Sequence, residues 1–294
     1  MSERKLKKIF IMLAVSLVLV GGLVVCGCTT TEDTGAVGQE KEITIGYVTW
    51  DSEIASTNVL RQAFEQAGYD VELVAVDVGP LYQALAKGDV DCTVSAWLPG
   101  THKTYMDTYG GDFVMAGKNL EGAKIGLVVP EYVPIDSIED LNAEKEKFDG
   151  KIIGIEPGAG IMRLTEDAIE AYGLDFTLIS SSSAGMAAEL RSAINDGDWI
   201  VVTGWTPHWK FARWDLKYLE DPKGVYGGDE YIATLARTGL ETDKPEAYTI
   251  LTRFYWTPED MESVMLAIEE GKSPEVAAKE WVDANQDVVD AWIA

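Results

Sequence analysis

An internal duplication constrains the fold of this chain more than any other feature of its sequence. Residues 45–102 and 153–208 show the same order of strand-like and helix-like segments, with comparable turns between them. In each copy a β-rich run leads through a loop into an amphipathic stretch, which ends at Gly68 or Gly173. A second strand, a second helix and a third apolar strand complete the unit. Strands that alternate with helices predict a mostly parallel sheet flanked by helices, so we expect two α/β lobes.

The segments between and after the copies indicate how the lobes are joined. Residues 124–129 and 231–236 have the pattern of strands, and 257–294 the pattern of amphipathic helices that return to the first lobe. Two such lobes place a ligand cleft between them, lined by the loops that follow the strands. The predicted divisions are 43–129 with 236–294 for lobe I, and 130–235 for lobe II.

The first 28 residues have the features of an export signal. Basic residues precede an apolar run at 9–25, which is at the short edge of what spans a bilayer. The run ends at Cys26-Gly27-Cys28, and a small residue directly before a cysteine resembles a lipoprotein box. We therefore predict a signal segment at 1–28 with lipidation at Cys28, and a flexible linker at 29–42. An uncleaved transmembrane anchor is the alternative, and both readings place the rest of the chain outside the cytoplasm, at the outer face of the membrane.

Charge and cysteine content exclude several classes of protein. The formal charge is −25, and about −28 without residues 1–27, so nucleic acid is a poor partner. Cys92 has no partner once Cys28 is lipidated, which predicts a buried free thiol. The chain has no nucleophile motif, metal-ligand spacing or phosphate loop, so we expect no enzyme, cofactor or metal. A surface lipoprotein without a ligand is a further alternative, and the aromatic loops described next argue against it.

Three of the nine tryptophans occupy matching loop positions. Trp50 follows the first strand of copy one, whereas Trp97 and Trp205 end the third strand of each copy, inside Trp-x-Pro turns. Packing in the core is the ordinary role for a single tryptophan. Three rings that converge at a cleft predict a box for a methylated ammonium ion, to which each desolvated ring contributes on the order of 2 kcal/mol.

The second copy contains a candidate anion site. Residues 156–161 form a Gly-rich loop that leads into a helix near Met162, and unpaired backbone N–H groups at a helix start attract a carboxylate. His102, five residues after Trp97, can donate a further hydrogen bond. Taken alone, the Gly-rich loop is also consistent with a simple turn, and His102 is also consistent with a surface residue.

Four stretches resemble the substrate-binding proteins of glycine betaine ABC transporters of the OpuAC type: YVTWDSEIAST, SAWLPGTHK, IGIEPGAGIM and VVTGWTPHW. The resemblance runs from about residue 43 to residue 294. It implies a two-lobed periplasmic-binding-protein fold of type II, with the ligand between the lobes. It also implies a trimethylammonium box of Trp50, Trp97 and Trp205, and a carboxylate held by the backbone amides of Gly160 and Ile161 and by His102. In some members the two halves occur in the opposite order.

The resemblance implies a role in osmoprotection, with a permease and an ATPase as partners and a monomeric binding protein. Choline, carnitine, proline betaine and ectoine remain alternative ligands, and choline differs in lacking a carboxylate. We expect ligand binding to close the lobes, because the candidate groups are divided between them.

Overall fold

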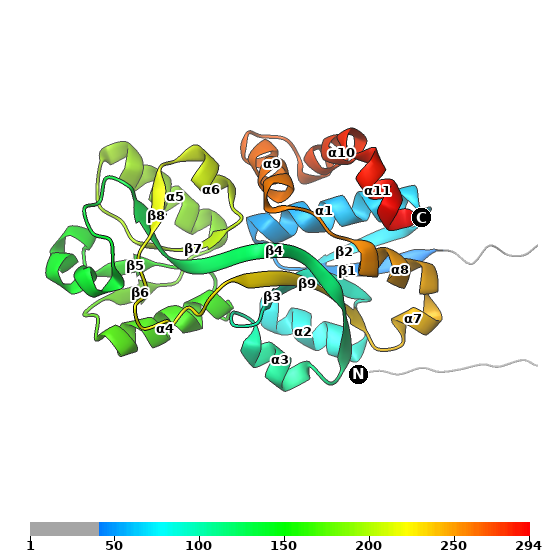
Figure 1. Ribbon diagram of the computed structural model, residues 1–294, viewed down its shortest axis with the longest axis horizontal. Coiled ribbons are helices and arrows are strands. Elements are labelled where there is room, and N and C mark those ends of the chain that lie inside the picture. Colours follow the sequence, from blue (N-terminus) through cyan, green and yellow to red (C-terminus); the bar gives the residue numbers. More distant parts are fainter. Residues whose placement is uncertain (1–40) are drawn as a thin grey trace, which may run out of the picture. The chain divides into compact units, whose positions relative to one another are not determined.

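The computed structural model describes residues 41–294 (Figure 1). The predicted signal segment and Cys28 lie outside the described residues, as does the linker up to residue 40. Residue 42, which was assigned to the linker, already belongs to the first strand. Within the described residues no helix is both long and apolar enough to cross a membrane.

The duplication predicted from the sequence is present as two units with the same order of elements. The first unit consists of β1 (Glu42–Tyr47), α1 (Asp51–Gln66), β2 (Asp70–Ala75), α2 (Val78–Lys87) and β3 (Cys92–Leu98). The second consists of β5 (Lys151–Ile153), α4 (Gly160–Tyr172), β6 (Thr177–Ile179), α5 (Ser183–Asp196) and β7 (Val202–Thr206).

The predicted stop at Gly173 is confirmed, whereas α1 ends at Gln66 with Ala67 as its C-cap, one residue before the predicted stop at Gly68. Helix α2 is capped by Gly88, α4 by Gly173 and α5 by Gly197, each with a positive φ that favours glycine.

The remaining elements join the two units and cover them. They are α3 (Lys103–Tyr109), β4 (Phe113–Pro130), η1 (Ile138–Phe148), α6 (Trp209–Arg213), β8 (Leu216–Tyr218), β9 (Glu230–Arg237), α7 (Leu240–Asp243), α8 (Pro245–Arg253), α9 (Pro258–Glu269), α10 (Pro274–Ala284) and α11 (Gln286–Ile293). The element η1, which ends just before Asp149, is a 3-10 helix that is interrupted by non-helical backbone at Glu144. Short turns of this kind are typical of 3-10 geometry.

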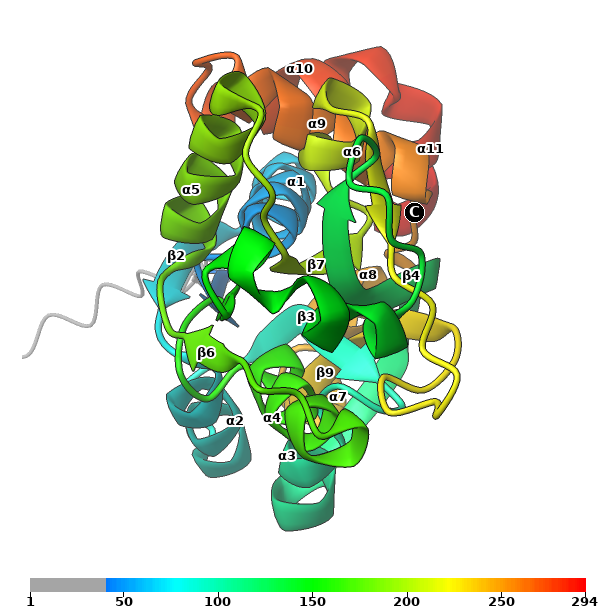
Figure 2. The ribbon, with the colours of Figure 1, turned by 90° about the vertical axis from the view of Figure 1, so that its left-hand side faces the viewer.

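The described strands follow one path in the order β2-β1-β3-β9-β4-β7-β5-β6, with β8 paired to β4. Strands β2, β1 and β3 are parallel, as are β6, β5 and β7, whereas β9 and β4 run antiparallel to their neighbours. Helices cover both faces of each parallel set: α1 lies opposite α2 and α3, and α5 lies opposite α4 (Figures 1 and 2). The predicted fold class is confirmed.

Strand β4 connects the two parallel sets, because its first part pairs with β9 and its last part with β7 (Figure 1). Residues 124–128 are hydrogen-bonded to β7, although the sequence analysis assigned 124–129 to lobe I. Residues 231–235 are hydrogen-bonded to β3, although they were assigned to lobe II. We therefore propose lobe boundaries at 123/124 and 229/230, because each strand segment is assigned to the lobe whose sheet it is hydrogen-bonded to.

The C-terminal helices pack on lobe I, as expected. Helices α9, α10 and α11 all contact α1. The predicted start of α9 is confirmed: Thr257 accepts from the Asp260 N–H in a capping box, and Pro258 occupies the first turn. Cys92 is a buried free thiol on β3, also as expected.

Candidate functional site

A small pocket with a volume of about 20 Å³ lies between the lobes, and its lining is almost entirely apolar. It brings together five of the six residues that the sequence singled out for ligand binding. These are Trp50 and Trp97 from lobe I, and Gly160, Ile161 and Trp205 from lobe II. The other lining residues are Thr101, Ile125, Ile155 and Ala159.

The three tryptophans are placed by the ends of regular elements. Trp50 is the N-cap residue of α1, Trp97 lies near the end of β3, and Trp205 near the end of β7. The peptide bonds Leu98–Pro99 and Thr206–Pro207, in the Trp-x-Pro turns of the two copies, are both cis. The indoles are 7%, 3% and 4% exposed, which means that the lobes enclose them.

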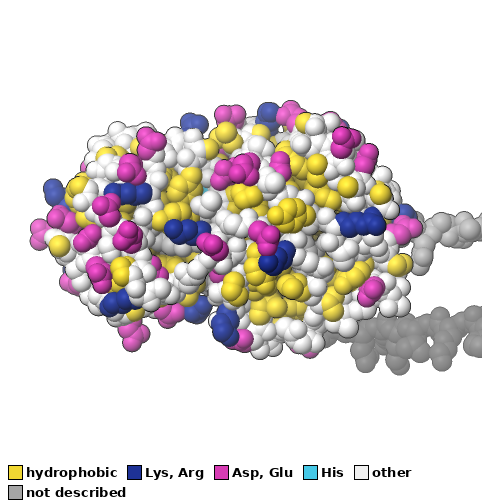
Figure 3. Space-filling model, in the orientation of Figure 1, with side chains coloured by type: hydrophobic (Ala, Val, Ile, Leu, Met, Phe, Trp, Pro, Cys, Tyr) yellow, Lys and Arg dark blue, Asp and Glu magenta, His cyan; other side chains and the backbone are white. Residues whose placement is uncertain are grey.

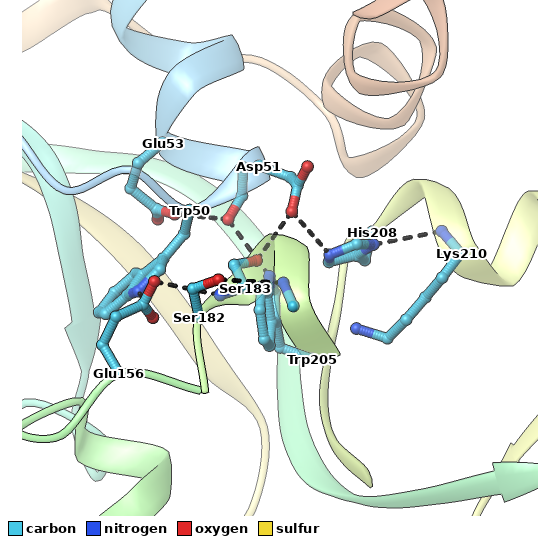
Figure 4. A network of polar contacts seen from close by, with 11 residues as sticks. Trp50, Asp51, Glu53, Glu156, Ser182, Ser183, Trp205, His208 and Lys210 are labelled. Carbon is cyan, nitrogen blue, oxygen red and sulfur yellow. Dashed lines mark hydrogen bonds and ion pairs between the residues drawn. The ribbon is translucent and has the colours of Figure 1, made fainter. Parts of the chain in front are cut away.

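Each of the three indole N–H groups has an acceptor outside the pocket lining. Trp97 Nε1 donates to Glu53 Oε1 at 2.6 Å. Trp50 Nε1 donates to Glu156 Oε2 at 3.1 Å, and Trp205 Nε1 to Ser52 Oγ at 3.3 Å. The last two bonds cross between the lobes (Figure 4). Contacts between the lobes therefore orient two of the three indoles, those of Trp50 and Trp205.

The N-terminus of α4 supplies unpaired donors at the pocket. The helix begins at Gly160 after the Gly-rich loop and has no side-chain cap at Ala159. Among the described residues, neither the Gly160 nor the Ile161 backbone N–H has a hydrogen-bond acceptor. Two free N–H groups at the positive end of a helix dipole can bind a carboxylate.

His102 is fully buried beside the pocket and is not a surface residue. Its Nδ1 accepts from the Trp97 backbone N–H at 3.2 Å and lies 3.1 Å from the Tyr82 hydroxyl. Burial lowers the pKa of His102 to about 3, so the ring is neutral and carries its proton on Nε2. This buried Nε2 has no partner among the described residues, and the His102 ring is centred 5.9 Å from the Trp50 ring. His102 is thus a neutral donor without a protein acceptor.

A polar cluster links the lobes next to Trp205 (Figure 4). Ser183 Oγ on α5 donates to Asp51 Oδ2 on α1 at 2.8 Å, and His208 Nε2 lies 3.4 Å from the same oxygen. Burial opposes ionisation of Asp51, but His208 and Ser183 together hold its pKa below the ordinary value. Burial lowers the pKa of His208 to about 4, with a further contribution from the charge of Lys210.

Lys210 is a fully buried lysine at the same place. Its Nζ lies 4.2 Å from the centre of the Trp205 ring and has no hydrogen-bond partner among the described residues. Burial lowers the pKa of Lys210 to about 7, and Asp51 partly opposes this shift. Lys210 is not part of the pocket lining.

The acidic residues of this region were not predicted from the sequence. Most acidic side chains are indeed spread over the surface, as the visible face in Figure 3 shows. Glu53 and Glu230, however, are buried, and Glu230 accepts from the Gly100 and Thr101 backbone N–H groups at 2.8 and 2.7 Å. The available signal was position: Glu53 is three residues after Trp50, in the same motif. No group of three His, Cys, Asp or Glu residues within 41–294 is arranged to hold a metal ion.

Comparison with known proteins gives one family. Residues 41–284 match the family OpuAC, described as the substrate binding domain of ABC-type glycine betaine transport system. The chain is 49% identical over 162 residues to a glycine betaine/carnitine transport binding protein, GbuC, of Listeria monocytogenes. That alignment covers 54% of this chain and 53% of the relative, so the chain matches about half the length of that protein.

Two solved structures extend the comparison to the fold. The lactococcal OpuAC protein in its closed conformation, complexed with glycine betaine, is 48% identical with a TM-score of 0.83, covering 86% of this chain and 100% of its own. A choline binding protein of an ABC transporter, in complex with choline, is 30% identical with a TM-score of 0.80, covering 86% and 91%.

Proposed function

Because the chain belongs to the OpuAC family, the substrate-binding domains of ABC-type glycine betaine transport systems, we propose that its interlobe pocket binds glycine betaine for import. The single observation that carries this proposal is the pocket itself. It combines three indoles with unpaired N–H donors in one enclosed space. Such a pair of subsites matches a ligand with a methylated cation at one end and a carboxylate at the other.

The indoles form the cation subsite of the proposed complex. A trimethylammonium group has no N–H to donate, so a carboxylate in the lining would be a poor partner and an apolar aromatic wall a good one. Each of Trp50, Trp97 and Trp205 attracts the cation through its π face and buries its methyl groups. Ammonium ions with free N–H groups would lose hydrogen bonds to water in this lining, so the subsite selects for methylation.

The carboxylate subsite is formed by the start of α4 and by His102. The Gly160 and Ile161 N–H groups and the His102 Nε2–H are three donors that have no acceptor in the described part of the chain. Buried donors without partners are costly, and a ligand carboxylate would satisfy all three.

The division of the pocket between lobes explains how binding drives closure. Two indoles come from lobe I, whereas the third indole and the amide pair come from lobe II. A ligand can contact every group only when the lobes are together, so its binding energy favours the closed state. The bonds of Trp50 to Glu156 and of Trp205 to Ser52 stabilise the same state.

The cellular setting is part of the proposal. We infer an extracytoplasmic monomer, held at the membrane through lipidated Cys28, that delivers its ligand to a permease and an ATPase. The match to half of GbuC, a transport binding protein, and the matched OpuAC family support the transport role. We propose no catalytic reaction, because the family is defined by substrate binding.

Glycine betaine should bind far more tightly than choline. Choline presents a hydroxyl where betaine has a carboxylate, and it therefore loses charge-assisted hydrogen bonds at the start of α4. Two lost bonds of about 1.5 kcal/mol each amount to roughly a hundredfold in Kd. Calorimetric titration with betaine, choline, carnitine, proline betaine and ectoine measures this directly. Equal affinities for betaine and choline would contradict the carboxylate subsite.

Lipid anchoring predicts that Cys28→Ser releases the protein from the membrane. We expect the wild type to fractionate with membranes and to incorporate labelled fatty acid in a bacterial host, and Cys28→Ser to do neither. Cys26→Ser is the matched control and should behave as the wild type. A Cys28→Ser protein that remained in the membrane would favour the transmembrane anchor instead.

A further inference from the structure

The three indole N–H groups of the pocket all lead to carboxylates. Trp97 donates directly to Glu53, and Trp50 donates directly to Glu156. Trp205 donates to Ser52 Oγ, which itself donates to Glu53 Oε2 at 2.5 Å. Glu53 therefore connects to one indole from each lobe, and Figure 4 shows Glu53 and Glu156 near the labelled indoles. None of the three rings ends on a neutral backbone carbonyl.

Glu53 is a costly residue in this position. Its side chain is fully buried, and none of the salt bridges among residues 41–294 includes Glu53 or Glu156. A buried carboxylate without a cation loses hydration that hydrogen bonds alone restore only in part. A glutamine would keep an acceptor for the Trp97 indole at a lower cost. Orientation of the ring alone therefore does not explain the charge.

The cation of a bound ligand supplies the missing partner. Glu53 lies at the N–H edge of Trp97 and is connected through Ser52 to the N–H edge of Trp205, and both tryptophans line the pocket. An indole that donates to a carboxylate has a more negative π face, and the carboxylate also attracts the cation across the ring. Both effects act on a charged head group and neither acts on a neutral one.

We propose that Glu53 is a positioning residue whose negative charge, transmitted through Trp97 and through Ser52 to Trp205, makes the pocket select a cationic head group over a neutral one of the same shape. Glu156 has the same relation to Trp50. This inference rests on the proposed function, because it assigns the basis of charge selection in the same pocket.

The behaviour of Glu53 in the protein agrees with a carboxylate that lacks a countercharge. Burial raises the pKa of Glu53 to about 7, the hydrogen bonds from Ser52 and Trp97 oppose this shift, and the charge of Asp51 adds to it. The other ionisable groups of the cluster are Glu156, His208 and Lys210, from lobe II. The ordinary pKa of a glutamate is 4.5, so the fold loses stability as the pH rises from 4.5 to about 7.

The test compares two ligands that differ only in charge. Glycine betaine and 3,3-dimethylbutanoate have the same shape and the same carboxylate, but carbon replaces nitrogen in the second. We expect Glu53→Gln to weaken betaine binding roughly tenfold, as expected for loss of one screened charge interaction, and to leave dimethylbutanoate binding unchanged. Affinities are measured by calorimetry, with dimethylbutanoate also measured by displacement of betaine. Glu65→Gln, on the same helix α1 and away from the pocket, removes an equal charge and should change neither.

Thermal unfolding without ligand provides a second readout, which reports whether Glu53 ionises in the folded protein. The stability associated with protonated Glu53 is fully present below pH 4.5 and is lost as the pH rises through about 7. Glutamine does not ionise, so the Tm of Glu53→Gln relative to the wild type should increase between pH 4.5 and pH 7 and change little above that.

Three results would overturn the inference. An equal loss for both ligands would show that Glu53 only orients the ring. Unchanged betaine affinity together with unchanged relative Tm would show that the charge of Glu53 affects neither ligand binding nor stability. Failure of the wild type to bind betaine at all would overturn the proposed function and this inference with it. If the wild type binds betaine and Glu53→Gln binds it equally well, only the inference is overturned.

Discussion

Replacing Gly160 with alanine should hold the two lobes apart and reduce betaine affinity by more than about a hundredfold, equivalent to roughly 2.7 kcal/mol. A Cβ at this position would lie 2.0 Å from the Thr101 carbonyl oxygen and 2.7 Å from its carbonyl carbon. Thr101 belongs to lobe I and Gly160 to lobe II, so the overlap is between backbones of opposite lobes. Small-angle scattering should show compaction of the wild type on addition of betaine and none for Gly160→Ala.

The fold itself should tolerate this change. Gly160 is the first residue of α4, where alanine is a better helix former than glycine, so Tm should be equal or higher. Gly79→Ala is the matched control, because Gly79 also lies in the first turn of a helix and its Cβ would meet only Tyr105 at 3.7 Å. Full compaction and normal affinity in Gly160→Ala would show that this contact does not limit closure.

Trp97→Ala should weaken betaine binding by about 2 kcal/mol or more, which is roughly thirtyfold in Kd. The variant loses one π face of the cation subsite and leaves Glu53 Oε1 without its indole donor. Trp97→Phe keeps an aromatic face and should recover part of the affinity. Calorimetric titration at constant salt measures both variants.

Loss of a buried indole also lowers stability, so folding must be checked by circular dichroism at the titration temperature. Trp199→Ala is the control, because Trp199 packs on Phe148 away from the pocket and should leave betaine affinity unchanged. Wild-type affinity in a folded Trp97→Ala protein would remove Trp97 from the site.

Local signals account for what could be predicted of the fold. The order strand, helix, strand, helix, strand is visible twice in the sequence because periodicity and glycine stops depend on neighbouring residues. The capping box at Thr257 was predictable for the same reason. The length of β4 was not, since its two parts pair with different strands, β9 and β7, and a single extended run gives no sign of that change.

The residues of the candidate site also fall into those that could be predicted from the sequence and those that could not. Trp50, Trp97, Trp205 and the Gly160–Ile161 amides could be named in advance, because they follow strands or begin a helix at equivalent places in the two copies. The roles of Glu53 and Glu156 could not, because a glutamate in an amphipathic helix or a loop is usually solvated. The burial of Glu53 depends on β3, and the bond of Glu156 depends on a tryptophan 106 residues earlier in the chain.

The sequence by itself therefore determined the two-lobed α/β architecture and the aromatic and amide groups of the pocket, since both arise from short-range patterns that are repeated in the chain. Only the tertiary structure decided the contacts of those groups. It placed the proton of His102 on Nε2, gave the indole N–H groups their carboxylate acceptors, and brought Thr101 close to Gly160. The physical reason is that hydrogen bonds, burial and steric contact depend on distance in space. In the closed protein, residues from opposite lobes meet at distances that sequence separation does not encode.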